Sequence, residues 1–100
     1  MCFVSDNTVQ YQYWMTDLTT PKNISHILYQ SRVPSRVNGM QIRAGLSSTI
    51  TDDPVVVTLT YVAEYYLQSY KINPPLLARY IGITGPNYSQ LELCSLMIFE

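Results

Sequence analysis

The strict alternation of side chains between Val55 and Ala63 constrains the fold of this chain more than any other feature. Because successive side chains of a strand point to opposite faces, one wholly apolar parity predicts a strand with one face in a core. Val and Thr favour a pleated surface over a helix, although Asp52-Asp53-Pro54 just before the stretch could cap a helix. The apolar parity consists of Val55, Val57, Leu59, Tyr61 and Ala63, and the mixed parity of Val56, Thr58, Thr60 and Val62.

The size and charge of the chain limit the classes of function. The sequence has 100 residues, of which 47% are hydrophobic and only 13% are charged, with a formal net charge of −1. We therefore expect one ordered domain over residues 1–100, or one half of a larger two-part subunit. A nearly neutral chain has no broad electrostatic attraction for nucleic acid or membrane, so any such contact would be local.

Cysteine and histidine usage predicts neither a disulfide nor a metal or other cofactor. Two cysteines so far apart, Cys2 and Cys94, are expected to be free thiols in a reducing compartment. The single histidine excludes a His-rich metal site. No basic leader and no long apolar run is found at the N-terminus, so we expect an intracellular protein, nuclear in a eukaryote, with no membrane contact.

Further strands are predicted on both sides of the central stretch. Alternation over 9–16 and over 40–46 predicts two half-buried strands, and Asn38-Gly39 before the second is a strong turn signal. A weak strand or connector is expected over 33–37, and a polar loop over 47–54. The last segment, Gln90–Phe99, fits either a strand or a helix.

Two short helices are predicted from apolar spacing and capping signals. Thr20 and Pro21 suit the start of a helix over 21–32, in which Ile24, Ile27 and Leu28 repeat at helical spacing. A second helix over 75–82 follows Asn73-Pro74-Pro75, and Gly82 would end it. Strands with two short helices predict an α+β domain, an antiparallel sheet with both helices packed on one face.

Catalysis receives little support from the residues. His26 and Cys94 form no recognisable motif, and the adjacent Asp52 and Asp53 fit a solvated turn better than an acid–base pair. No stretch has the glycine spacing of a phosphate-binding loop. We therefore expect a protein that is not an enzyme.

Residues 76–91 resemble a helix-turn-helix. Ala78 and Gly82 match the small residue and the turn glycine of that motif, and Asn87, Ser89 and Gln90 would face the major groove. The predicted recognition helix carries Glu92 and no Lys or Arg, which disfavours contact with phosphates.

The order of the predicted elements resembles the first half of a DNA sliding clamp subunit, the family of proliferating cell nuclear antigen and the checkpoint clamps. The similar segments are 23–28, 38–48, 55–60 and 64–70. The resemblance implies a ring of related subunits joined through sheet edges, which contacts the phosphates of duplex DNA without reading bases in replication or repair. The residues that it implies for these contacts are Lys22, His26, Gln30 and Arg79, and a solvated helix face is the alternative explanation for them.

A third interpretation is a structural or assembly protein, such as a capsid or scaffold subunit, without chemistry. Low charge and abundant Tyr, Ser and Thr suit a chain that packs against its own copies. The clamp is the hypothesis that uses the whole order of elements, and the helix-turn-helix and the assembly protein remain its alternatives.

Overall fold

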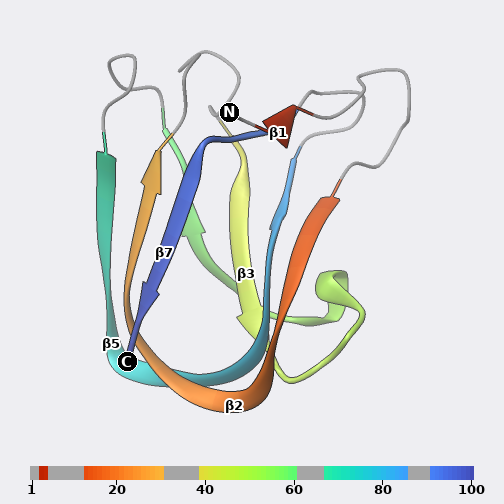
Figure 1. Ribbon diagram of the computed structural model, residues 1–100, viewed down its shortest axis with the longest axis vertical. Helices are drawn as coiled ribbons and strands as arrows, with labels where there is room; N and C mark the ends of the chain where they lie inside the picture. The colour runs from red at the N-terminus through yellow and green to blue at the C-terminus, as the bar shows by residue number, and fades with distance from the viewer. Residues whose placement is uncertain (1–2, 5–12, 31–38, 61–66, 86–90) are drawn as a thin grey trace.

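The computed structural model describes residues 3–4, 13–30, 39–60, 67–85 and 91–100, and their regular structure consists almost entirely of strands (Figure 1). A 3-10 turn, η2 (Ile50–Asp52), is the one helical element recorded in these ranges. No helix in this part of the chain is long and apolar enough to cross a membrane. The strands are β1 (Phe3–Val4), β2 (Tyr13–Gln30), β3 (Gln41–Gly45), β4 (Val55–Thr58), β5 (Leu67–Thr84), β6 (Glu92–Leu93) and β7 (Ser95–Phe99).

Five strands form one antiparallel sheet in the order β4-β3-β5-β2-β7, and β1 pairs separately with β6. The two long strands, β2 and β5, have 18 residues each and pair with one another over both of their halves. Figure 1 shows both of them curving through the bottom of the view and rising again on the other side. The sheet is thus folded over on itself, and its two halves form the layers of a β-sandwich.

The pairing of the shorter strands assigns them to opposite layers. β3 pairs with the C-terminal half of β5, from Gln41 opposite Thr84 to Gly45 opposite Tyr80, and β4 extends this layer beyond β3. β7 pairs with the C-terminal half of β2, from Gln30 opposite Ser95 to His26 opposite Phe99. Each layer therefore combines one half of each long strand with shorter strands at its edge.

The corner of the folded sheet lies where the pairing of β2 with β5 is interrupted. The register shifts between Asp17 and Lys22, and again between Ile24 and His26. Pro21 and Thr19, which has a φ of 72°, fall in the first interruption, and Pro74-Pro75 fall opposite the second. Because proline has no N–H to donate to a ladder, these prolines fit where the ladder lapses and the strands bend.

The core lies between the two layers. Each layer contributes a pair of almost completely buried residues, Ile27 and Tyr29 from one layer and Ile81 and Ile83 from the other. The residue between the members of each pair is either less buried, as Leu28 is, or smaller, as Gly82 is. Burying one large apolar side chain contributes about 1.5–3 kcal/mol, so this cluster is a main source of stability. Other buried members are Ile24, Met40, Ile42, Ala44, Leu59, Ala78, Leu91 and Leu93.

Both predicted helices, and with them the α+β fold class, are wrong. Residues 21–30 belong to β2, and residues 75–82 belong to β5. Ile24 and Ile27 are both buried although they lie three residues apart, because the register shift between Ile24 and His26 changes which parity faces the core. A strand that bends at an irregularity thus has the i, i+3 spacing that predicts a helix.

Most of the predicted strands are confirmed where the structure describes them. Residues 13–16 and 41–45 are strands, and Val55–Thr58 forms β4. Leu59 and Thr60 lie beyond the end of β4, and Val55, which was expected on the core face, is exposed. The ambiguous segment Gln90–Phe99 contains β6 and β7. The predicted turn contains Gly39, whose φ is 88°. The weak strand over 33–37 lies outside the described residues, as do the first strand before Tyr13 and the central stretch beyond Thr60.

Candidate functional site

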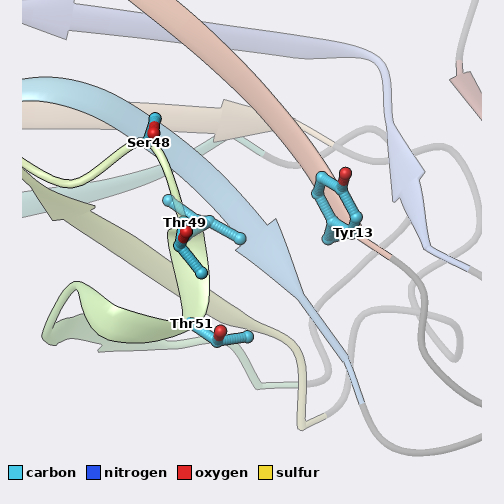
Figure 2. Close-up of a pocket in the computed structure, with 5 residues that line it drawn as sticks. Tyr13, Ser48, Thr49 and Thr51 are labelled. Carbon is cyan, nitrogen blue, oxygen red and sulfur yellow. The ribbon is translucent and has the colours of Figure 1, made fainter.

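An open cavity of about 210 Å³ lies between the start of β2 and the loop that joins β3 to β4. Tyr13 lines one side, and Ser48, Thr49, Ile50 and Thr51 line the other (Figure 2). Pockets for drug-sized ligands usually enclose about 300–1,000 Å³. A cavity of this size suits one small ring better than a large cofactor.

The loop over residues 46–54 carries four of the five lining residues, and its own backbone bonds fix its shape. Asp52 N donates to Thr49 O (2.9 Å) and Asp53 N donates to Ile50 O (3.1 Å), which closes the turn η2. At the end of the loop, Ala44 N donates to Pro54 O over 3.2 Å. The polar loop predicted over 47–54 is therefore confirmed, and it is an ordered part of the site.

The guanidinium of Arg43 connects this loop to the sheet. Its Nη1 donates to the carbonyl oxygens of Asp53 (2.9 Å) and Thr51 (3.3 Å), and its Nε donates to the Thr84 hydroxyl over 3.2 Å. Its Nη2 lies 3.5 Å from Oε1 of Gln41. Because Arg presents its donors in a rigid fork, one side chain on β3 can hold two loop carbonyls in fixed positions.

Two glycines permit the loop to pack closely against the sheet. A Cβ on Gly45 would overlap the side chain of Asp53, with its Cγ only 2.6 Å away. A Cβ on Gly82 would lie 2.6 Å from Cγ1 of Ile50 and 2.7 Å from the carbonyl oxygen of Trp14. Asp53 is buried against this surface, and its Oδ1 accepts a hydrogen bond from Ser47 N at 3.0 Å. Its Oδ2 has no partner among the described residues.

The cavity presents an aromatic ring opposite exposed hydroxyl groups. Tyr13 is 61% exposed, and Ser48, Thr49 and Thr51 are exposed as well. Within the part of the chain that the structure describes, no hydrogen bond is donated by the hydroxyls of these four residues. Each of these hydroxyls can both donate and accept, so together they suit a ligand with hydroxyl groups of its own.

The four residues predicted to contact DNA lie on the two long strands, β2 and β5. Lys22 lies at the corner of the sheet, with its Nζ 3.9 Å from Oε1 of Glu100. His26 and Gln30 lie on β2 next to β7. Arg79 lies on β5 and is bonded to Asp17. Since these positions are strands, no helix presents them to a phosphate backbone.

Cys94 is disulfide-bonded, and the expectation of a free thiol at this position is therefore wrong. The register of β1 and β6 places Phe3 opposite Leu93, which brings the neighbours of the two cysteines of the sequence together. The large sequence separation of Cys2 and Cys94 misled the prediction, because the pairing of the two ends of the chain is not visible in the sequence.

No family model and no curated protein matches the chain, whereas many solved structures share its fold. A fucolectin from striped bass (Morone saxatilis) serum superposes with a TM-score of 0.88 at 21% identity, over 97% of this chain and 35% of that protein. The carbohydrate-binding module CBM62 of Clostridium thermocellum Xyl5A superposes with a TM-score of 0.82 at 19% identity, over 98% of this chain and 73% of that protein. The CBM32 of AlyQ was solved in complex with 4,5-unsaturated mannuronic acid. It superposes with a TM-score of 0.75 at 22% identity, over 99% of this chain and 77% of that protein.

The chain has the fold of lectins and carbohydrate-binding modules. It spans about a third of the length of the striped bass lectin and about three quarters of the two modules. This fold overturns the resemblance to a sliding clamp, whose helices are absent from the described residues. The duplex DNA partner and the replication or repair role are not supported, and neither is the assembly protein.

The helix-turn-helix over 76–91 is also overturned. Residues 76–84, which include its first helix and turn, are the end of β5, and they pair with both β2 and β3. Residues 86–90 lie outside the described part of the chain. Ala78 and Gly82, which match the motif, are instead buried in the sandwich, and a Cβ on Gly82 would overlap Ile50.

The cavity was not predicted from the sequence. The loop over 47–54 has a visible signal, the run Ser47-Ser48-Thr49 ahead of a turn, but this signal only indicates a polar loop. The alternation over 9–16 places Tyr13 in a strand and indicates no functional role for it. The pairing of β2 with β5 and the packing of Ile50 against Gly82 of β5 bring Tyr13, at the start of β2, next to a loop that follows it by more than thirty residues.

Proposed function

We propose that this chain is a carbohydrate-binding domain without catalytic activity of its own, and that its cavity between Tyr13 and the loop over 46–54 holds a sugar. The observation that carries the proposal is an exposed aromatic ring opposite three exposed hydroxyl side chains within one small cavity. The fold supports it, because the similar solved structures are lectins and carbohydrate-binding modules, domains that bind sugars without reacting with them.

A sugar ring is chemically two-sided, and the cavity offers a partner for each side. One face of a pyranose carries mainly C–H groups and packs on an aromatic ring, which supplies a large contact area at a low cost in conformational entropy. The hydroxyl groups at its rim exchange hydrogen bonds with side chains that can donate and accept. Tyr13 suits the first role, and Ser48, Thr49 and Thr51 suit the second.

The experiment is a glycan array probed with the whole chain, followed by calorimetry on the best ligand. We expect Tyr13→Ala to lower the affinity about tenfold, since stacking on an aromatic ring contributes roughly 1 kcal/mol beyond its area. Tyr13→Phe keeps the ring and should retain most of the affinity. Leu77→Ala is the matched control, because Leu77 is 47% exposed on β5 and does not line the cavity.

Two results would contradict the proposal in different ways. An array without a bound glycan would reject carbohydrate binding by this chain. Binding that Tyr13→Ala leaves unchanged would keep the carbohydrate function but reject the cavity as its site. Release of reducing sugar from the bound glycan would contradict the non-catalytic part of the proposal.

A further inference from the structure

We propose that the cavity selects an uncharged sugar and discriminates against acidic sugars such as uronic acids. This inference rests on the proposed function and adds the chemical class of the ligand. The fold alone does not decide this, because the solved AlyQ module with this fold holds an unsaturated mannuronic acid. The side chains that line this cavity therefore determine whether it takes a neutral or an acidic sugar.

Among the residues that the structure describes, the lining of the cavity contains no cation. Its side chains are a phenol, three hydroxyls and the apolar chain of Ile50. A carboxylate that enters such a site gives up its water shell and receives at most neutral hydrogen bonds in return. An uncharged hydroxyl group loses much less on entry, because the same side chains can replace its water.

Arg43, a cation that contacts the loop over 46–54, is already bound to the protein. Arg43 lies behind the loop and donates to Thr51 O, Asp53 O and the Thr84 hydroxyl, with a fourth contact to Gln41. Its guanidinium is only partly exposed and points at loop carbonyls. Recruiting it to a sugar carboxylate would break the contacts that position Thr51 itself.

The charges of the loop itself are negative. Asp52 belongs to the turn η2 next to Thr51 and is exposed, and Asp53 follows it and is buried. Asp53 Oδ2 has no hydrogen-bond donor among the described residues. An acidic sugar would therefore enter beside a loop that carries Asp52 next to Thr51, and like charges repel.

The test compares sugars that differ in one group. The probes are the methyl glycosides of glucose and galactose, the corresponding uronic acids, and the methyl esters of those acids, titrated into the labelled chain at neutral pH. Amide shifts of Tyr13, Ser48, Thr49 and Thr51 report binding at the cavity. We expect saturable shifts with at least one neutral glycoside, and roughly tenfold weaker binding or none with its acid. The methyl ester should recover most of the affinity, because it keeps the size of the acid and removes the charge.

A charge reversal in the loop provides a second readout. Asp52→Lys should improve binding of the uronic acid several-fold, by roughly the strength of an exposed ion pair, and leave the neutral glycoside within about twofold. Added salt should reduce this gain. Glu100→Lys makes the same change in net charge beyond the end of β7, outside the lining of the cavity, and should change neither affinity.

Different results would reject the selectivity for neutral sugars and the proposed carbohydrate binding itself. Equal binding of the acid and the neutral sugar at the cavity would overturn the inference and leave carbohydrate binding intact. Sugar binding that shifts other amides only would also overturn it. If neither these sugars nor the glycan array gives any binding, the proposed function itself is wrong.

Discussion

Asp17 and Arg79 form a two-pronged ion pair that joins β2 to β5 at the corner of the sheet. Arg79 Nε lies 2.9 Å from Asp17 Oδ1, and Arg79 Nη2 lies 3.0 Å from Asp17 Oδ2. Asp17 Oδ1 also accepts a hydrogen bond from Thr19 N at 2.8 Å, within the interrupted part of the ladder. The pair thus replaces ladder bonds where the two long strands bend, and the guanidinium also lies 5.2 Å from the centre of the Tyr80 ring.

Acid should weaken the contribution of this ion pair to stability. The hydrogen bonds from Arg79, and then from Thr19 N, lower the pKa of Asp17 below its usual value of 3.8. A lowered folded-state pKa gives stability that is present above the unfolded-state pKa and is lost as the pH falls through the folded-state value. We expect Asp17→Asn to be less stable than the native chain at neutral pH, and the difference to vanish at low pH. Urea unfolding between pH 7 and pH 2 measures this.

The partner residue provides the control for this prediction. Arg79→Gln should give the same pH dependence, and the two substitutions together should cost less than the sum of the single ones, because they remove the same interaction. Both side chains are about two-fifths exposed, so salt should also reduce the effect. Additive effects, or a difference that persists at pH 2, would show that the pair does not act as described.

The fork of Arg43 should be needed for the shape of the loop over 46–54. Arg43→Lys keeps the charge but cannot hold the carbonyl oxygens of Thr51 and Asp53 while bonding Thr84. We expect a loss of about 1–2 kcal/mol in the free energy of unfolding and faster amide exchange at residues 47–53. Sugar affinity should fall in parallel. An unchanged exchange pattern in the loop would contradict this role of Arg43.

The close approach of Gly45 to Asp53 leads to a prediction about packing. Gly45→Ala should cost about 1–3 kcal/mol, because the new Cβ would overlap the Asp53 side chain. The cost should be smaller when it is measured in an Asp53→Ala background, where most of that side chain is absent. Thermal unfolding of the two single variants and the double variant measures the coupling. If Gly45→Ala lowered the stability equally in the native and Asp53→Ala backgrounds, the new Cβ would not clash with Asp53.

The sequence predicts strands well where their alternation is regular and fails where the strands bend. β3 and β4 are short, and the alternation over 40–46 and 55–58 identifies both. β2 and β5 change parity at their irregularities, so the spacing of Ile24 and Ile27 imitates a helix. Pro21 and Pro74-Pro75 indicate breaks in regular structure, but the sequence does not show that they mark one corner shared by two long strands.

The candidate site could be predicted only in part, because it depends on contacts between distant segments. A polar loop before β4 follows from Ser47–Pro54 alone. Its position beside Tyr13 depends on the pairing of β2 with β5 and on the packing of Ile50 of the loop against Gly82 of β5. The ion pair between Asp17 and Arg79 likewise joins residues 62 positions apart and has no local signal.

The disulfide of Cys94 yields a prediction about both stability and compartment. A bond between the two cysteines of the sequence would close a loop of about 90 residues, and removing such a bond from a small domain typically costs about 2–5 kcal/mol. We expect Cys94→Ser, or treatment with a reductant, to lower the free energy of unfolding by an amount in this range. Ser95→Ala, next to it on β7, should have a much smaller effect.

Mass spectrometry tests the bond directly. Digestion without reduction should release one peptide pair joined through Cys2 and Cys94, and reduction should add two mass units to the intact chain. Because disulfides persist in oxidising compartments, this result would favour an extracellular or similar location, whereas the intracellular location expected from the sequence stays a prediction. Two titratable thiols in the folded chain, with stability unaffected by reductant, would contradict the disulfide and restore the expectation of a reducing compartment.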